Sequence, residues 1–189
     1  DNPDVAYQQA AALALMGRTD EARATLDEIL RAHPGHPATL AERGRLAAQE
    51  GDDAAAVDLL GRAVRANRGS LGARHLYALA LARVGRADEA AREEAEAQAL
   101  KTDLDQIGDL IAGPLQANPN DPAVHHRIAL IALHAGQPDE ALRWLRSALE
   151  ADPNHLPTHQ TLTKFYYAAG NPVLAARHRA IAAQLEKRP

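Results

Sequence analysis

The sequence holds nine histidines but few of the other side chains that enzymes use. His155 and His159 stand four residues apart near the expected start of a helix, a spacing at which two imidazoles can bind one divalent ion. A zinc site needs three or four ligands, and the sequence indicates no third. His155 and His159 are therefore weak candidates for a metal site, and packing in or beside the core is the default expectation for the histidines.

Other catalytic groups lack the sequence context that they need. Serine occurs only at Ser70 and Ser147, outside any nucleophile-elbow motif, and there is no glycine-rich phosphate loop. The chain has no cysteine, which excludes a thiol nucleophile, disulfides and thiolate zinc sites. Neighbouring carboxylates such as Glu93 and Glu94 are expected on solvent faces. We expect no catalysis and no cofactor.

Composition narrows the choice of partners. Basic residues number 21 and acidic residues 25, which gives a net charge of −4, and there are one Trp, one Phe and four Tyr. Nucleic-acid binders usually carry a basic surplus with aromatic side chains, so nucleic acid is not an expected partner. No run approaches the roughly 18 apolar residues of a membrane-spanning helix, so we expect a soluble chain without membrane insertion, in the cytoplasm or the periplasm. Because residue 1 is Asp1 and not Met, a longer parent chain is expected.

An internal sequence repeat predicts the secondary-structure elements that carry these side chains. Val and Ile are scarce while Ala and Leu are abundant, which favours helices. Pro turns at Pro3, Pro34, Pro119 and Pro153 alternate with Gly turns, and apolar residues between them recur three and four apart. Each period therefore predicts helix, Gly turn, helix, Pro turn. The turn glycines are spaced by 34, 34, 51 and 34 residues at Gly17, Gly51, Gly85, Gly136 and Gly170.

This pattern resembles the tetratricopeptide repeat family, over almost the whole chain and in five copies. The small residue of the second helix matches at Ala22, Ala56, Ala90, Ala141 and Ala175, and that of the first helix at Ala10, Gly44, Ala78 and Ala129. The large apolar residue of the second helix matches at Leu26, Leu60 and Leu145. Thr163, Glu94 and Arg179 depart from the pattern. The resemblance implies an all-α, right-handed solenoid that binds proteins, and it places His125 and His159 at a bulky first-helix position.

The interval of 51 residues equals one and a half repeats, so an interruption is expected after Glu94. Apolar residues in residues 102–117 form one stripe, which predicts a separate inserted helix ending near Gly113-Pro114. The alternative is one long helix from Arg86 to Ala112 with a bend at Gly108. We expect one solenoid with three repeats in residues 1–101, the inserted helix, and two repeats in residues 118–189.

First helices line the inner surface in this architecture, and residues four apart share a helix face. The expected groove therefore presents cationic or neutral hydrogen-bonding groups: Tyr7, Arg45, Gln49, His75, Arg83, His126, His134, Gln160, Lys164 and Tyr167. Such a surface suits an extended, acidic peptide. The alternative interpretation is that these groups merely solvate the inner face.

Together these observations predict a non-catalytic scaffold that binds a partner peptide or protein. Two alternatives stay open. The chain could be the docking or regulatory arm of a larger enzyme or envelope complex, or a metal-linked sensor that uses His155 and His159. The sequence does not fix the oligomeric state.

Overall fold

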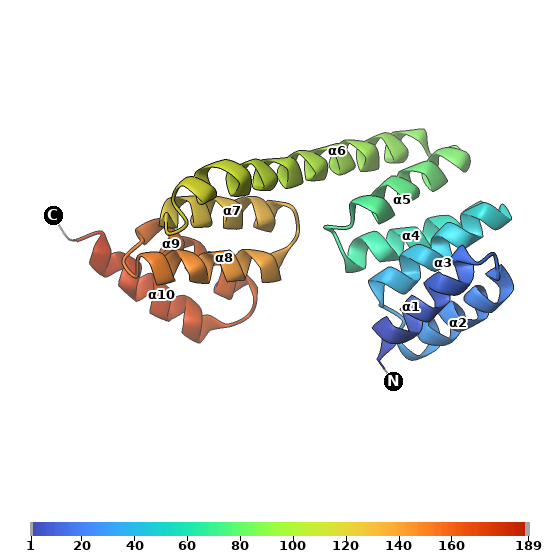
Figure 1. Ribbon diagram of the computed structural model, residues 1–189, viewed down its shortest axis with the longest axis horizontal. Coiled ribbons are helices and arrows are strands. Elements are labelled where there is room, and N and C mark those ends of the chain that lie inside the picture. The colour runs from blue at the N-terminus through green and yellow to red at the C-terminus, as the bar shows by residue number, and fades with distance from the viewer. Residues whose placement is uncertain (1, 188–189) are drawn as a thin grey trace. The chain divides into compact units, whose positions relative to one another are not determined.

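The computed structural model describes residues 2–187, and every regular element among them is helical. Ten α-helices and one π-helical segment follow one another along this part of the chain (Figure 1). They are α1 (Pro3–Leu15), α2 (Thr19–Ala32), α3 (Pro37–Glu50), α4 (Asp53–Ala66), α5 (Leu71–Arg83), α6 (Ala87–Leu110), η1 (Ile111–Leu115), α7 (Pro122–His134), α8 (Pro138–Ala151), α9 (Leu156–Ala168) and α10 (Pro172–Leu185). The structure confirms the all-α helical solenoid that the repeat predicts.

The turns follow from the residues that the repeat places in them. All five turn glycines have φ between 70° and 82°, the left-handed conformation that ends a helix. After Gly51, Gly136 and Gly170, the next helix begins at a proline or behind a capping side chain. At α4, for example, the Asp52 carboxylate accepts a hydrogen bond from the backbone N–H of Ala55 at 3.0 Å.

The two helices of a repeat approach closely because small residues line their contact. The alanines that recur at one position of the second helices, Ala22, Ala56, Ala90, Ala141 and Ala175, are all buried. Gly44 shows the constraint most directly, since a Cβ atom built there would lie 2.7 Å from Cγ of Leu60. Only glycine allows α3 and α4 to pack at this distance.

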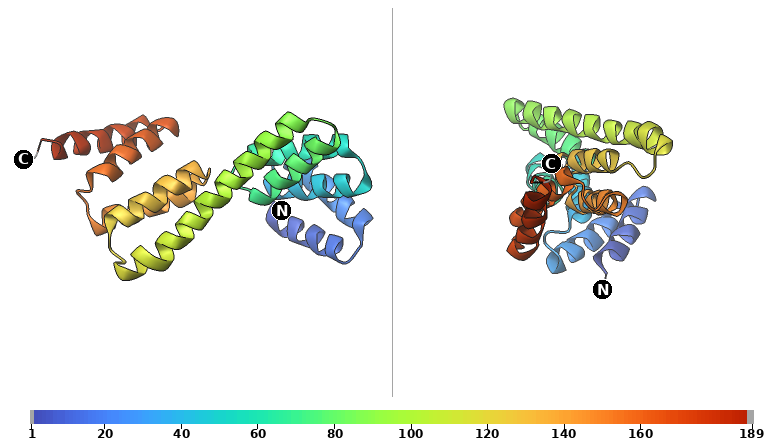
Figure 2. Two further views of the ribbon diagram at one scale, coloured as in Figure 1. Left: turned by 90° about the horizontal axis from the view of Figure 1, so that it is seen from above. Right: turned by 90° about the vertical axis from the view of Figure 1, so that its left-hand side faces the viewer.

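The prediction of a separate helix over residues 102–117 is wrong. α6 continues without a break from Ala87 to Leu110 and then passes into η1 (Figure 2). The alternative of one long helix describes the chain better, although the departure from α-helical geometry lies in Ile111–Leu115 and not at Gly108. Pro114 explains this position, because a proline inside a helix has no N–H to donate and forces the backbone to open locally.

The chain divides into two compact units, Asp1–Lys101 and Thr102–Pro189. In each unit, the first helix of one repeat packs on the preceding repeat and covers its large apolar residue. Leu26 and Leu60 in the first unit and Leu145 in the second are thereby fully buried. Among residues 2–187, no helix is both long and apolar enough to cross a membrane.

Candidate functional site

The predicted groove residues are shared between the two units. The first unit holds Tyr7 on α1, Arg45 and Gln49 on α3, and His75 and Arg83 on α5. The second unit holds His126 and His134 on α7, and Gln160, Lys164 and Tyr167 on α9. All ten lie on first helices, and each unit presents its own set.

Two first helices show the same alternation of polar and apolar side chains. Leu79 stands between His75 and Arg83 on α5, and Leu130 stands between His126 and His134 on α7, each at four-residue spacing. We call these two sets the α5 stripe and the α7 stripe. Leu79 is 47% exposed and Leu130 is 44% exposed, so neither leucine is needed to fill the core. Sequence reasoning did not include these two leucines in the site.

The arginines of the first unit are already engaged within the chain. Two nitrogens of the Arg45 guanidinium, Nε and Nη2, donate to the Glu42 carboxylate at 2.9 Å and 2.5 Å. Nη1 of Arg83 donates to the backbone oxygen of Ala48 at 2.9 Å and lies 3.5 Å from Oδ1 of Asp53. The surface of the first unit is therefore less basic than the list of its groove residues suggests.

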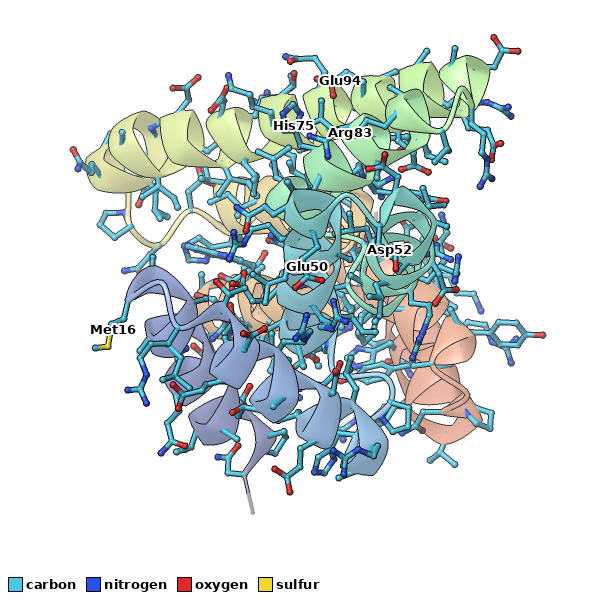
Figure 3. The ribbon with its side chains drawn as sticks, turned by 90° about the vertical axis from the view of Figure 1, so that its right-hand side faces the viewer. Met16, Glu50, Asp52, His75, Arg83 and Glu94 are labelled. Atoms are coloured by element: carbon cyan, nitrogen blue, oxygen red, sulfur yellow. The ribbon has the colours of Figure 1, made fainter. Side chains whose placement is uncertain are left out.

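Two groove histidines also face carboxylates of the same chain. Nδ1 of His75 lies 3.2 Å from Oε2 of Glu94, and both side chains are more than half exposed (Figure 3). Nδ1 of His134 lies 2.6 Å from Oδ2 of Asp103. The exposed position of Glu94 agrees with the expectation that no helix covers this site of the repeat. These partners are 19 and 31 residues away in sequence, which is why local spacing did not indicate them.

Tyr7 lines a depression of about 330 Å³ on the first unit, together with Ala41, Glu42 and Leu76. Burial raises the pKa of the Tyr7 hydroxyl, and the nearby Glu42 carboxylate raises it further. The hydroxyl therefore stays protonated and can donate a hydrogen bond. The depression is thus lined by apolar side chains together with one hydrogen-bond donor, the Tyr7 hydroxyl, and one carboxylate, that of Glu42.

The α9–α10 surface carries two cations without a partner in the described part of the chain, beside a depression. Lys164 and Arg179 have no hydrogen-bond or ion-pair partner among residues 2–187, and Tyr167 is 78% exposed. Gln160 donates from Nε2 to the Glu186 carboxylate at 2.8 Å. A depression of about 570 Å³ is lined by Thr163, Lys164, Tyr167, Pro172, Ala175, Ala176 and Arg179. Thr163 and Arg179 were not predicted as site residues, although their departure from the repeat pattern was the available signal.

The candidate metal ligands are used in hydrogen bonds. Nε2 of His159 lies 2.9 Å from the backbone oxygen of Pro153, which can only accept, so Nε2 carries the proton. Nδ1 of His159 is then bare and accepts from Nδ1–H of His178 at 2.9 Å. Nδ1 of His155 lies 2.7 Å from Oγ1 of Thr158. Within residues 2–187, no group of three or more potential ligands could hold a metal ion.

The His159–His178 contact has equivalents in other repeats with different chemistry. The same two repeat positions hold Leu40 and Leu59 in the second repeat, where both pack into one apolar cluster. In the third repeat, Arg74 donates to the Glu93 carboxylate at 2.7 Å. In the fourth repeat, the rings of His125 and Trp144 lie 5.5 Å apart. His125 and His159 are 4% and 3% exposed, so both pack as predicted.

Burial shifts the titration of three histidines in the second unit. It lowers the pKa of His126, His155 and His178 below the usual value for histidine. A neighbouring imidazole lowers the pKa of His126 and of His178 further, as with His155 beside His126, whose rings are 5.5 Å apart, whereas the Asp152 and Asp121 carboxylates partly oppose the effect of burial on the pKa of His155. These side chains are therefore held in the neutral form.

Side chains that resemble catalytic groups have structural partners. Oγ of Ser70 caps α5 by accepting from the backbone N–H of Ala73 at 3.3 Å. Glu93 pairs with Arg74 and Glu94 with His75, so these carboxylates do not converge on one reacting position.

Comparison with known proteins agrees with the repeat architecture. Family models described as tetratricopeptide repeat match residues 3–46, 71–93, 103–162 and 132–178. The chain belongs to the tetratricopeptide repeat family, whose members are protein-interaction scaffolds. A comparison with curated proteins gives no match.

Solved structures that match are also tetratricopeptide proteins. MamA from Desulfovibrio magneticus RS-1, from residue 41 to its end, is 18% identical over 99% of this chain and 96% of its own, with a TM-score of 0.46. YrrB, described as a TPR protein with an unusual peptide-binding site, is 17% identical over 96% of this chain and 84% of its own, with a TM-score of 0.47. A structure named MamA MSR-1 is 21% identical over 100% of this chain and 99% of its own, with a TM-score of 0.44.

Proposed function

We propose that this chain is a scaffold without catalytic activity of its own, and that it holds a partner peptide against its first helices. The observation that carries the proposal is the pair of exposed leucines, Leu79 and Leu130, at the same position of the α5 and α7 stripes. An exposed leucine gains roughly 1.5–3 kcal/mol when a partner covers it. Polar side chains beside each leucine can fix the direction of a bound peptide.

The bound segment is proposed to carry Asp or Glu beside its apolar residue. His75, Arg83 and His134 flank the two leucines and already bind carboxylates of the chain. The His75–Glu94 pair is exposed on both sides, and exposed ion pairs contribute only about 0–1 kcal/mol, so a partner carboxylate can replace Glu94 at little cost. Gln49 and Tyr7 on the neighbouring first helices are proposed to extend the surface in the first unit.

The test begins with selection from a displayed library of short random peptides. We expect enriched peptides to contain a large apolar residue flanked by Asp or Glu. Leu79→Asp should weaken a peptide bound at the α5 stripe at least tenfold, and Leu130→Asp should do the same for a peptide bound at the α7 stripe, each measured by fluorescence polarisation. Val173→Asp is the matched control, because Val173 is 77% exposed and lies outside both stripes.

Selection that enriches no peptide would count against the proposal. So would a peptide that binds Leu79→Asp, Leu130→Asp and the unchanged chain equally well. Circular dichroism on each variant separates lost binding from lost folding.

A further inference from the structure

The α9–α10 face of the fifth repeat has the shape of a helix-binding site that residues 2–187 leave open. In the first, second and fourth repeats, the equivalent face is covered by the next first helix, namely α3, α5 and α9. The covered residue there is Leu26, Leu60 or Leu145, each fully buried. Arg179 occupies the same position in the fifth repeat and is exposed. In three repeats of this chain, the element that packs on the equivalent face is therefore an α-helix.

The floor of the face is small and apolar. Ala175 and Ala182 are 5% and 6% exposed, and the neighbouring Ala176 and Ala183 are open to solvent. Two adjoining depressions, of about 570 and 410 Å³, lie over this floor and share Thr163, Lys164 and Arg179. A row of alanines lets a second helix approach closely, as the small residues do inside each repeat.

The rim of the face carries two cations. Lys164 and Arg179 border both depressions and have no partner among the described residues. Among the described residues that line the two depressions, Glu186 is the one carboxylate, and Gln160 donates a hydrogen bond to it. The rim therefore favours negatively charged side chains on whatever covers it.

We infer that the α9–α10 face binds an acidic amphipathic helix of a partner protein. The apolar stripe of this helix lies on the alanine floor, and its Asp or Glu side chains pair with Lys164 and Arg179. This surface goes beyond the α5 and α7 stripes, because its floor and Arg179 lie on a second helix.

The experiment uses three synthetic helices about 14 residues long, the length of α3, stapled so that they are helical when free. They share one Ala/Leu stripe and carry Glu, Gln or Lys on the polar face. The acidic helix should bind best, the Lys helix should bind least, and added salt should weaken the acidic complex. Arg179→Glu with Lys164→Glu should weaken the acidic complex about tenfold or more and make the Lys helix the preferred ligand.

Matched variants separate this site from the stripes. Arg177→Glu makes the same charge change on α10, two residues from Arg179 on another side of the helix, and should leave binding unchanged. Leu130→Asp should spare the helix complex, and Arg179→Glu should spare a stripe-binding peptide. A negative result for one surface therefore does not count against the proposal for the other surface.

Three results overturn the inference. The first is equal binding of the three helices, and the second is that none binds. The third is a dimer of this chain, measured by light scattering, that Arg179→Glu dissociates, since a second copy would then occupy the face. Salt dependence with the unchanged chain decides the matter even if the double variant does not fold.

Discussion

His178→Phe tests the hydrogen-bond pattern assigned to the fifth repeat. Phenylalanine keeps a ring against Tyr166, which stacks on His178 at 5.7 Å, but removes the N–H that donates to His159. Nδ1 of His159, a residue only 3% exposed, is then an acceptor without a donor, which costs about 1–3 kcal/mol. For a unit of this size, each kcal/mol lowers the unfolding midpoint by roughly 4–8 °C, so we expect a decrease of about 4–24 °C.

The chain supplies its own reporter for this measurement. Trp144 is the single tryptophan and lies in the second unit, so its fluorescence follows that unit during thermal unfolding. The fourth repeat already contains the arrangement that His178→Phe would create. There, Nδ1 of the buried His125 lies beside the ring of Trp144 and has no hydrogen-bond partner. We therefore expect a folded but less stable protein. His178→Gln, which keeps an N–H donor, should lose less stability, and His33→Phe in the first unit should not change the Trp144 transition.

Acidification should act on the same contact. The folded-state pKa of His126, His155 and His178 is lowered by burial, so the unfolded chain binds more protons than the folded chain near the ordinary histidine pKa of about 6.5. Stability of the second unit should consequently fall as the pH drops from neutral through about 6.5, and level off below the folded-state values. The slope should be shallower in His178→Phe. Two results would refute the assigned His178–His159 hydrogen bond. One is an unfolding midpoint that does not change with pH over this window, and the other is a His178→Phe protein as stable as the unchanged protein.

Three further substitutions test the packing. Glu93→Ala should destabilise the first unit by about 1–3 kcal/mol, because the Arg74 side chain stays partly buried without its carboxylate partner. Replacing both Arg74 and Glu93 by leucine, the pair found in the second repeat, should be neutral or stabilising. Gly44→Ala should cost about 1–3 kcal/mol, since Leu60 has to move away from the new methyl group. Asp121→Ala removes the cap that accepts from the first turn of α7 and should cost about 1 kcal/mol. Urea unfolding followed by circular dichroism measures the first two and Trp144 fluorescence the third.

Much of the fold follows from short-range chemistry. A glycine such as Gly51 ends a helix, a proline or aspartate begins the next, and an alanine such as Ala56 marks where two helices touch. α6 was mispredicted because Thr102 and Asp103 resemble caps. The apolar stripe nevertheless continues in phase from Leu100 to Leu110, so nothing in the helix has to stop there.

The candidate site is less accessible to sequence reasoning. Helix periodicity predicts which residues occupy the first-helix faces, and Leu79 and Leu130 could have been included by the same rule. The neutralising partners could not be inferred in the same way, because the Glu94 carboxylate reaches His75 only once α5 and α6 are packed. The sequence shows that Arg179 stands where other repeats have leucine. What this difference means becomes clear only when the structure shows which helices cover the equivalent leucines.

The varied pairs at one repeat position imply that the five copies are not interchangeable modules. Mild acid should loosen the His159–His178 repeat and should not affect the leucine pair of the second repeat. Splicing the copies in a new order would therefore also move this acid sensitivity to another repeat along the chain.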